Sequence, residues 1–361
     1  MSDLKVNKFL TVGTHFKISK GKKSEPSDTS TLRYIQIDDL RNDNNLKYAL
    51  VSKTNVLCNK QDILIAWDGA NAGTIGYCLE GAIGSTLAKL TPITNAVFSS
   101  YAGRFLQSKF KYLRENCTGA TIPHISKASL INIKIPLLPL AEQQKIAAIL
   151  DAADSLRQKD QQLVERYTAL SQSLFLEMFG DPVTNPMGWL SVNWEDVLTI
   201  KNGKNQCKVV NSEGLYPIYG SGGIMGFADD YLCEAGTTVI GRKGSINKPI
   251  YVKTRFWNVD TAFGLCAGDN LNSIFLYYFC IKFNFLKLNK ATTLPSLTKT
   301  DLLKITMPLP PMNLQNQFYE RIQLIEAQKQ QAQLSLAKSE ALFNSLLQRA
   351  FTGELTAKLV A

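Results

Sequence analysis

The chain has 361 residues, of which 45% are hydrophobic and 19% are charged. This composition predicts two or three folded domains with proper cores and excludes a disordered chain. The net charge of +10 favours a polyanionic partner, although charge alone does not single out nucleic acid.

The apolar runs and the cysteines of the sequence do not indicate a membrane protein or a protein of an oxidising compartment. No apolar run approaches the roughly 18 residues of a membrane-spanning helix, and the start, MSDLKVNKFL, lacks the pattern of a signal peptide. The seven cysteines are odd in number and scattered, with no Cys-x-x-Cys pair. That pattern indicates reduced thiols, and it argues against a zinc site or a disulfide framework. We therefore expect a cytoplasmic protein without membrane contact.

The N-terminal part of the chain mixes short strand-like runs with turns. Apolar or alternating runs of strand length occur at residues 31–40, 62–67, 74–79 and 131–136. Residues 97–116 have helical spacing and carry several basic side chains, including Arg104. These elements predict a mixed α/β or α+β module.

Residues 136–181 predict one long helix after this module. Proline fits the first turn of a helix and glycine is common just past its end, so Pro139 and Gly180 are the expected boundaries. Two rows with seven-residue spacing predict a coiled-coil seam. Its expected members in this helix are Ile146, Ile149, Leu156, Leu163, Tyr167, Leu170 and Leu174. A helix of this length, about 60 Å, requires a partner helix.

The partner lies in the same chain, because residues 308–355 repeat this stretch. Pro136 and Pro139 match Pro308 and Pro311 at a constant offset, which predicts that Phe318, Ile325 and Leu346 lie in the second half of the seam. The match continues upstream in three further pairs of segments: 119–136 with 291–308, 16–22 with 198–204, and 62–73 with 237–247. The chain therefore consists of two copies of one unit, a globular module followed by a long helix.

The positive charge sits on the two modules. Residues 1–139 hold 18 basic and 10 acidic residues, and residues 182–310 hold 13 and 9. The first helix region, 140–181, holds 4 basic and 7 acidic residues. Basic modules suit a polyanion, and helices of low or negative charge suit protein contacts. Amide side chains expected on the solvent faces of the helices also suit such contacts, with plain solvated surface as the alternative: Gln143, Gln144, Gln158, Gln161, Gln328, Gln330 and Gln331.

The sequence shows no catalytic signature. No P-loop is present, because the glycine-rich stretches lack the required lysine. The stretch 220–226, GSGGIMG, approaches a dinucleotide-binding pattern but leads into FADDYL, a poor helix start. The two histidines, His15 and His124, are too few for a metal cluster or a catalytic triad. We interpret both as surface or groove-wall residues.

Binding features are better supported, since they occur at equivalent places in both copies. Basic residues follow the first strand of each module, and polar residues fill a glycine loop in each. Arg, Lys, Asn and Gln can pair with base edges, and glycine lets the backbone approach phosphates. The candidate DNA-binding residues are Lys20, Lys22, Lys23, Arg33, Trp67, Asn71, Thr74, Arg104, Thr121, His124, Lys201, Lys204, Lys208, Arg242, Lys243, Ser245 and Asn247. A plain surface charge is the alternative for each one alone.

The motif I-x-I-P-L-x-P-L-x-E-Q-Q-x-I, residues 133–146, resembles the boundary between target-recognition domain and conserved helix in the DNA specificity subunits of type I restriction-modification systems. A degraded copy stands at 305–318, with Leu-Gln-Asn in place of Glu-Gln-Gln, and the resemblance covers nearly the whole chain. It implies two target-recognition domains, each reading half of an asymmetric split DNA site. It further implies two conserved helices packed antiparallel as a spacer.

The same resemblance implies a chain without catalysis or cofactors of its own. Its partners would be double-stranded DNA, two modification (methyltransferase) subunits and, through them, restriction subunits. S-adenosylmethionine, ATP and Mg²⁺ would be used by those subunits. Two alternatives stay open: an orphan two-domain DNA-binding protein of the same fold, and a purely structural coiled-coil scaffold.

The expected domain limits follow from the repeat. They are residues 1–138 and 181–310 for the two target-recognition domains, 139–180 and 311–352 for the two spacer helices, and 353–361 for a C-terminal tail.

Overall fold

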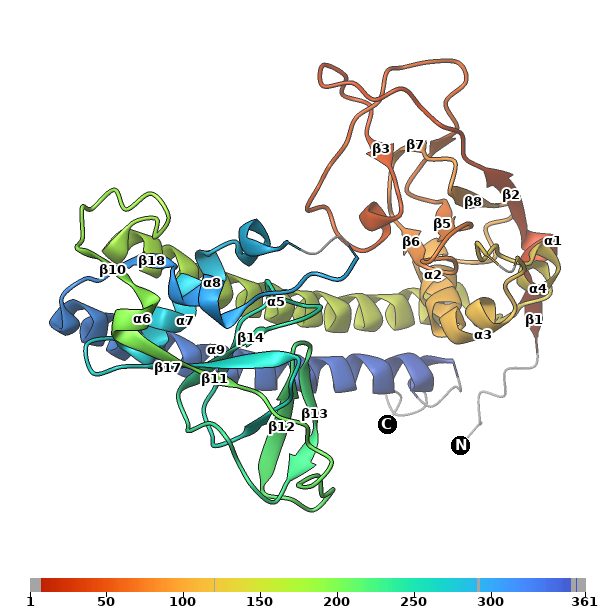
Figure 1. Ribbon diagram of the computed structural model, residues 1–361. Coiled ribbons are helices and arrows are strands. Elements are labelled where there is room, and N and C mark those ends of the chain that lie inside the picture. Colours follow the sequence, from red (N-terminus) through yellow and green to blue (C-terminus); the bar gives the residue numbers. More distant parts are fainter. Residues whose placement is uncertain (1–7, 120, 291–292, 352–354, 356–361) are drawn as a thin grey trace. The chain divides into compact units, whose positions relative to one another are not determined.

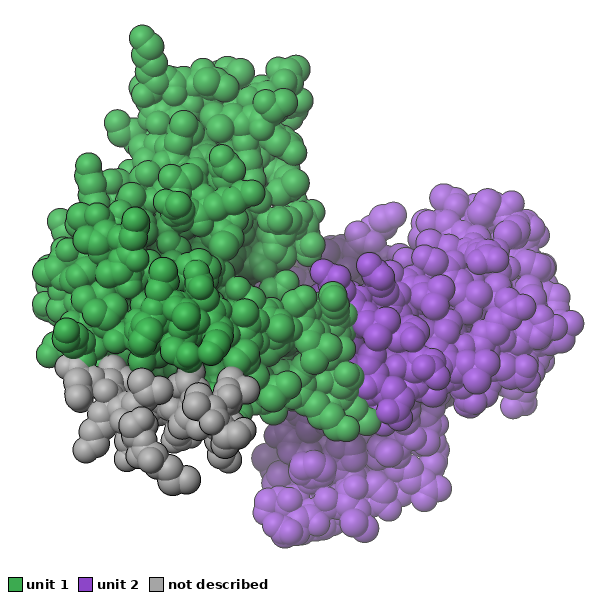
Figure 2. Space-filling model, turned by 180° about the vertical axis from the view of Figure 1, so that it is seen from behind, with its two compact units in different colours: residues 1–161, 334–361 green, residues 162–333 purple. Residues whose placement is uncertain are grey.

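The computed structural model describes residues 8–119, 121–290, 293–351 and 355. The chain divides into two compact units, coloured separately in Figure 2: residues 1–161 with 334–361, and residues 162–333. Each unit combines one globular module with a part of each long helix. The expected C-terminal tail lies outside the described residues apart from Leu355.

The described residues of the first module, module 1, form nine strands with short helices between them, and Figure 1 shows how these elements are arranged. Its elements in the described part of the chain are β1 (Phe9–Thr11), α1 (Val12–His15), β2 (Phe16–Lys20), β3 (Tyr34–Ile35), η1 (Asp38–Leu40), β4 (Leu57–Cys58), β5 (Ile63–Ala66), β6 (Ile75–Tyr77), β7 (Gly81–Ile83), β8 (Leu87–Pro92), α2 (Ser99–Ser108), α3 (Phe110–Glu115), α4 (Lys127–Ile131) and β9 (Lys134–Pro136). The long helix α5 (Leu140–Phe179) follows.

The second module, module 2, repeats this order with a different middle. Its elements in the described part of the chain are β10 (Ser191–Asn193), α6 (Trp194–Val197), β11 (Leu198–Asn202), β12 (Tyr216–Gly220), β13 (Gly223–Ala228), β14 (Thr237–Gly241), β15 (Ile250–Val252), β16 (Trp257–Asn258), β17 (Ala262–Ala267), α7 (Ser273–Lys282), η2 (Phe285–Leu288), α8 (Lys299–Leu303) and β18 (Thr306–Pro308). The long helix α9 (Met312–Ala350) follows.

Each module is built on an antiparallel four-stranded sheet, in the order β2-β8-β5-β6 in module 1 and β11-β17-β14-β15 in module 2. A three-stranded sheet (β3-β7-β4 or β13-β12-β16) and a two-stranded sheet (β1-β9 or β10-β18) complete each module. The β1-β9 and β10-β18 pairs bring the start of each module to the strand that enters its long helix. The mixed α/β fold class with a duplicated unit is confirmed.

Two expected elements differ in detail. The run 97–116 forms two helices instead of one, because the backbone at Lys109 leaves helical geometry between α2 and α3. The run 31–40 contributes only the short strand β3, and its last residues form the turn η1. The alternation of apolar residues therefore predicted a strand longer than the one that forms, because most of this segment is loop.

The long helices begin and end at the proline and glycine residues that bound them. α5 begins directly after Pro139 and ends directly before Gly180, whose φ of +76° favours a residue without a Cβ. α9 begins directly after Pro311. Proline therefore stands at the same place before each helix.

The two helices run antiparallel. In unit 1 the start of α5 shares a core with the end of α9, where Ile146 and Leu150 cluster with Ala350. In unit 2 the end of α5 meets the start of α9, with the ring centroids of Phe175 and Phe318 5.6 Å apart. The predicted seam residues that are at least partly buried are Ile146, Ile149, Tyr167, Leu174, Phe318, Ile325 and Leu346.

The second leucine row lies at the surface instead of in the seam. Leu156, Leu163 and Leu170 are 47%, 40% and 50% exposed. Each helical residue turns about 100°, so positions three and four residues after Ile146 lie on opposite sides of it. The buried face of α5 follows the four-residue step to Leu150. The leucines of the row spaced three residues on therefore turn away from the contact, while Ile149, the first residue of that row, stays partly buried.

Each helix is joined to its module by one buried glutamine. Gln143, expected on a solvent face, is instead fully buried. Its Oε1 accepts a hydrogen bond from the backbone N of Phe98 (2.8 Å), and its Nε2 donates to the carbonyl oxygens of Ala96 (3.0 Å) and Leu138 (2.9 Å). The prediction was wrong for this residue, because the module covers the first turn of the helix.

Gln315 makes the same joint in module 2. Its Oε1 accepts from the backbone N of Asn272 (2.8 Å), and its Nε2 donates to the carbonyl oxygens of Pro310 (2.8 Å) and Asn270 (3.4 Å). The middle residue of Glu-Gln-Gln is thus the one kept in the degraded Leu-Gln-Asn copy. This correspondence was readable in the sequence, and it is the signal that marks the joint.

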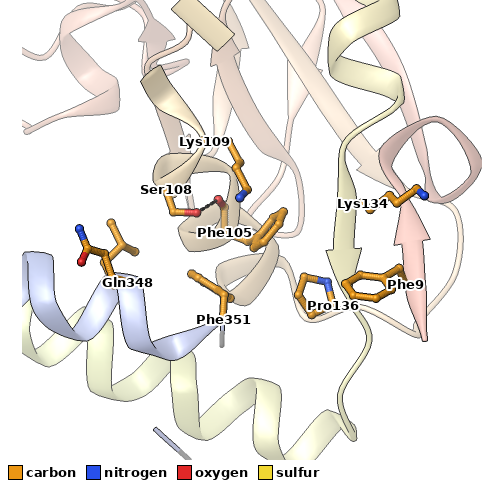
Figure 3. Close-up of a pocket in the computed structure, with 9 residues that line it drawn as sticks. Phe9, Phe105, Ser108, Lys109, Lys134, Pro136, Gln348 and Phe351 are labelled. Atoms are coloured by element: carbon orange, nitrogen blue, oxygen red, sulfur yellow. Dashed lines mark hydrogen bonds between the residues drawn. The ribbon is translucent and has the colours of Figure 1, made fainter. Parts of the chain in front are cut away.

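The end of α9 belongs to the core of unit 1. Figure 3 shows a cavity of about 380 Å³ whose lining comes from distant parts of the chain. Phe9 and Pro136 come from the β1-β9 pair, Phe105 comes from α2, and Phe351 follows α9. The ring centroids of Phe351 and Phe105 are 5.0 Å apart. Module 1 is therefore completed by residues from the far end of the sequence.

Candidate nucleic-acid interface

Three loops of module 1 meet at one end of its four-stranded sheet. The chain leaves β2 at Gly21, whose N donates to the carbonyl of Leu87 (2.9 Å). A Cβ at this position would collide with the carbonyl of Gly84, so only glycine fits. The Trp67 N donates to the Thr86 carbonyl (2.8 Å), and this fixes the start of the glycine loop.

The third loop precedes α4 and pairs with the second. The N of Ile125 donates to the carbonyl of Trp67 (2.9 Å), and the N of Gly69 donates to that of Pro123 (2.9 Å). The residue between, Asp68, forms a bridge with His124. The loops after β2, after β5 and before α4 therefore present their side chains together.

Module 2 builds the same arrangement. The Arg242 N donates to the Thr261 carbonyl (2.7 Å), and the Leu297 N donates to the Arg242 carbonyl (2.9 Å). Gly203 stands where Gly21 does, and a Cβ there would collide with the carbonyl of Val259. The backbone pairing makes Arg242 the counterpart of Trp67, and the following Lys243 the counterpart of Asp68. One scaffold thus presents different side chains in the two modules.

In module 1 the arrangement centres on Asp68. Its two carboxylate oxygens contact Lys20 Nζ (2.7 Å) and His124 Nδ1 (2.6 Å). Partial burial acts to raise the pKa of Asp68, but the hydrogen bonds from Lys20 and His124 outweigh it and hold that pKa below its usual value. The side chains of Lys20 and His124 are 53% and 47% exposed. Both predicted residues are thus accessible while held in place by one carboxylate.

Asn71 and Thr74 are joined by a residue that the sequence reasoning missed. The exposed Arg41 donates from Nη2 to Asn71 Oδ1 (2.8 Å) and to Thr74 Oγ1 (3.4 Å). No sequence signal marks Arg41, because the contact spans 30 residues or more. It adds a guanidinium to the edge of the module 1 glycine loop.

Arg33 and Arg104 make internal contacts instead of facing outwards. Arg33 is paired with Asp39 (3.0 Å) and Asp43 (2.5 Å), and its side chain is 20% exposed. Arg104 is only 4% exposed. The prediction of a DNA contact was wrong for Arg104, because the helical spacing of α2 directs this side chain towards α5. It lies in a network of polar contacts with that helix.

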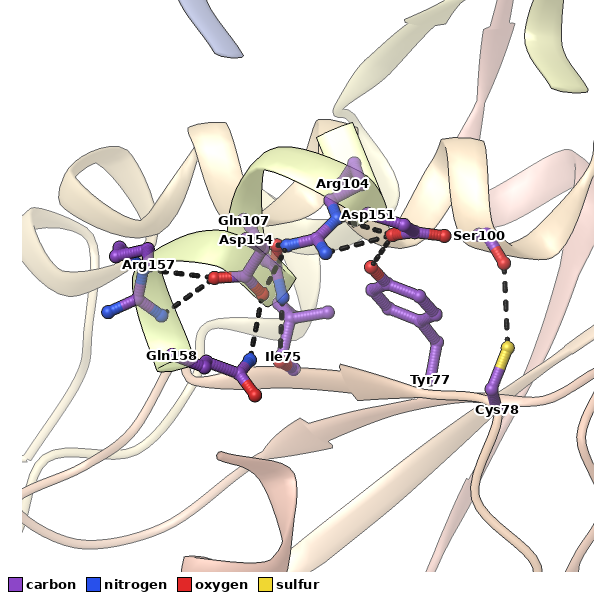
Figure 4. A network of polar contacts seen from close by, with 10 residues as sticks. All are labelled: Ile75, Tyr77, Cys78, Ser100, Arg104, Gln107, Asp151, Asp154, Arg157 and Gln158. Carbon is purple, nitrogen blue, oxygen red and sulfur yellow. Dashed lines mark hydrogen bonds and ion pairs between the residues drawn. The ribbon is translucent and has the colours of Figure 1, made fainter. Parts of the chain in front are cut away.

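Figure 4 shows this network. Arg104 donates from Nε to Asp151 Oδ1 (2.9 Å) and from Nη1 to Asp154 Oδ2 (3.0 Å). The Tyr77 hydroxyl donates to Asp151 Oδ1 (2.6 Å), and Arg157 Nη2 donates to Asp154 Oδ1 (2.7 Å). Burial acts to raise the pKa of Asp154, but the two arginines outweigh it and lower that pKa. The network ties module 1 to α5 through charged side chains.

The remaining predicted residues fall into two groups. Asn247 Oδ1 accepts from the Phe285 N (2.8 Å), and Lys201 Nζ donates to the Leu232 carbonyl (3.2 Å), so both have contacts within the module. Trp67 is partly buried against the core of module 1. Lys201 and Asn247 are nevertheless exposed, and so are Lys22, Lys23, Thr121, Lys204, Lys208, Arg242, Lys243 and Ser245.

In the described part of the chain, no three His, Cys, Asp or Glu side chains form a group that could hold a metal ion. No helix within the described ranges has the length and apolar character needed to cross a bilayer.

The modules match a known domain. The type I restriction modification DNA specificity domain matches residues 5–166 and again residues 186–335. The type I restriction enzyme MjaVIII specificity subunit of Methanocaldococcus jannaschii is 26% identical over 405 residues, which cover 97% of this chain and 93% of the relative.

Solved structures support the fold. The type I restriction-modification S subunit from M. genitalium superposes with a TM-score of 0.66 at 18% identity, over 97% of this chain and 98% of its own. A structure concerned with complex assembly and conformational transition of the type I R-M system gives a TM-score of 0.51 at 19% identity, over 96% and 98%. Because the domain matches span most of the sequence, the chain belongs to the type I restriction-modification DNA specificity family.

Proposed function

We propose that this chain is the DNA-reading subunit of a type I restriction-modification complex, in which each module reads one half of an asymmetric bipartite site. One observation carries the proposal. The same three-loop scaffold occurs once in each module, with Asp68, Lys20 and His124 in one and Arg242 and Lys243 in the other. Identical scaffolds with different side chains suit two different half-sites, because bases are distinguished by side-chain donors and acceptors.

The charges divide into phosphate contacts and base contacts. The segments that follow β2 and β11, the first strands of the two four-stranded sheets, carry the exposed lysines Lys22, Lys23, Lys204 and Lys208. Flexible lysines suit phosphates, which position a protein without reading sequence. The residues of the glycine loops are held by backbone hydrogen bonds, and this rigidity suits base reading.

The helices would set the spacer and dock the partners. The exposed leucines of α5 and α9 in the described part of the chain are Leu140, Leu156, Leu163, Leu170, Leu176, Leu324, Leu334 and Leu342. Exposed apolar side chains in such rows suit partner helices, here those of two modification subunits that bring restriction subunits with them. This chain would perform no catalytic step. S-adenosylmethionine, ATP and Mg²⁺ would be bound by the partner subunits.

Module exchange tests the proposal. Residues 1–138 are replaced by the corresponding module of another family member, chosen to keep an arginine at the position of Arg104. Sequencing of methylated bases in cells that contain the modification subunits should show a change in one half of the motif only. A change in both halves, or in neither, would refute the division of labour. DNA binding without any methylation would favour the orphan DNA-binding protein.

A further inference from the structure

The β12–β13 hairpin of module 2 exposes an apolar surface. Ile224, Met225 and Phe227, all on β13, are 59%, 63% and 44% exposed. β13 is the edge strand of its three-stranded sheet, with β12 as its neighbour (Figure 1). Natural edge strands are normally protected by lysine, proline or a covering element. The end of β13 has such a cover, since Val210 bridges Ala228 and the Asn211 N donates to the Phe227 carbonyl (2.9 Å). Ile224 and Met225 lie beyond this cover, and exposed apolar side chains on an edge strand indicate a binding surface.

A β-bulge and an open glycine turn shape the end of the hairpin. A register shift opposite Ile218 and Tyr219 inserts Met225 as an extra residue in β13. Such bulges redirect side chains and are frequent beside functional sites. The Met225 sulfur lies over Gly220, where a Cβ would collide with it. A Cβ at Gly222 or Gly223 would meet no atom within 4 Å, so the turn is open to close approach.

This end of the hairpin is continuous with the glycine loop of module 2. A Cβ on Gly241 would lie 3.0 Å from Ser221 Cβ, and one on Gly244 would lie 3.5 Å from Ser221 Oγ. Arg242 and Lys243, between those glycines, are exposed. Apolar side chains and cations therefore share one surface. Among the described residues of module 1, the three-stranded sheet β3-β7-β4 pairs no two consecutive strands, so no equivalent hairpin is present.

We infer that this hairpin reads A·T pairs in the half-site of module 2 through the methyl groups of thymine. The inference rests on the proposed function. A two-stranded ribbon fits the major groove, and the thymine methyl is the apolar mark displayed there. The side chains of Ile224 and Phe227 cannot donate or accept hydrogen bonds and that of Met225 is only a weak acceptor, so they suit a methyl group and not a base edge. Arg242 and Lys243 would donate hydrogen bonds to base edges beside these methyl groups.

Replacement of thymine by uracil tests the contact, because uracil lacks only the methyl group. The motif is first obtained by sequencing of methylated bases. Full-length protein is then bound to DNA in which uracil replaces each thymine of the module 2 half-site. The wild type should bind about fourfold more weakly for each contacted methyl lost, the equivalent of one buried CH₂ group. Uracil in the other half-site should have no hairpin-dependent effect.

The variant Ile224→Ser/Met225→Ser should bind the thymine site more weakly and respond little to uracil. Leu190→Ser is the matched control, since Leu190 is 73% exposed and lies outside the hairpin. A half-site of G·C pairs alone, or an equal uracil penalty in variant and wild type, would overturn the inference and leave the proposed function standing. Wild-type protein without sequence-selective binding would overturn both. Unchanged thermal unfolding shows that both variants remain folded.

Discussion

Replacement of Arg104 by methionine should loosen module 1 from the long helix. Breaking a buried ion pair costs about 3–5 kcal/mol when the remaining charge has no other partner. Here Asp154 keeps its bonds to Arg157, and the Asp151 side chain is 42% exposed and can be hydrated. The loss should therefore be smaller, about 2–3 kcal/mol in the free energy of unfolding.

Chemical denaturation measures this loss, and amide hydrogen exchange assigns it to a module. Exchange should increase in α2 and the first turns of α5, but not in α7. Lys111→Met is the control, because its ion pair with Glu115 is 89% and 62% exposed and should contribute at most about 0.5 kcal/mol. Arg104→Met combined with Asp154→Met should recover part of the loss, since no charge then stays buried. A loss below about 1 kcal/mol, or equal exchange in both modules, would refute the assignment.

The pH dependence of this stability difference follows from the direction in which folding shifts the pKa of Asp154. The pKa of Asp154 is lower in the folded protein than in the unfolded chain. Its contribution is therefore fully present above the unfolded value, about 3.9, and is lost as pH falls through the folded value. The difference in stability between wild type and Arg104→Met should shrink below about pH 4. A constant difference from pH 7 to pH 3 would contradict the linkage.

Three further results are expected. Gln143→Leu should lower the free energy of unfolding by about 2–4 kcal/mol, because it leaves one buried backbone N and two carbonyls without their partner; a loss under 1 kcal/mol in denaturation would contradict the joint. Lys22→Ala/Lys23→Ala should weaken binding to all DNA sequences and reduce the log–log salt slope by about 1.8; an unchanged slope would remove both residues from the phosphate contacts. Insertion of one heptad after Asp160 and after Ser335, which contact each other, lengthens the helix pair by about 10.5 Å. The preferred spacer should then grow by about three base pairs, and an unchanged optimum in a spacer library would refute the helices as a ruler.

The sequence was sufficient for the features that depend on local chemistry and on the repeat. Pro139 and Gly180 bound α5 because proline and glycine act on the backbone itself. Gly21 and Gly203 occupy equivalent positions in the repeat because the backbone of each lies too close to another backbone segment for a Cβ. Signals of this kind do not require knowledge of distant contacts.

Features set by tertiary packing were not predictable in the same way. Arg104 has the same appearance in sequence as the other basic residues of its run, and its carboxylate partners lie 47 and 50 residues away. Leu156 fitted a heptad row, but the buried face of the helix was decided by where module 1 packs. Arg41 reached the glycine loop only through folding. Which side chains face DNA therefore required the structure.

The two glutamine joints have a consequence for how such chains evolve. Gln143 and Gln315 each bind only backbone atoms of their module and of the segment that enters the helix. A joint of this kind requires a backbone shape and no particular side chain. A module can therefore accumulate substitutions, or be replaced by recombination, while the glutamine continues to seat it. In module 1 the Arg104 network and the packing of Phe105 against Phe351 do require matched side chains, so new sequence preferences can arise by exchange of modules that share that arginine and that apolar face.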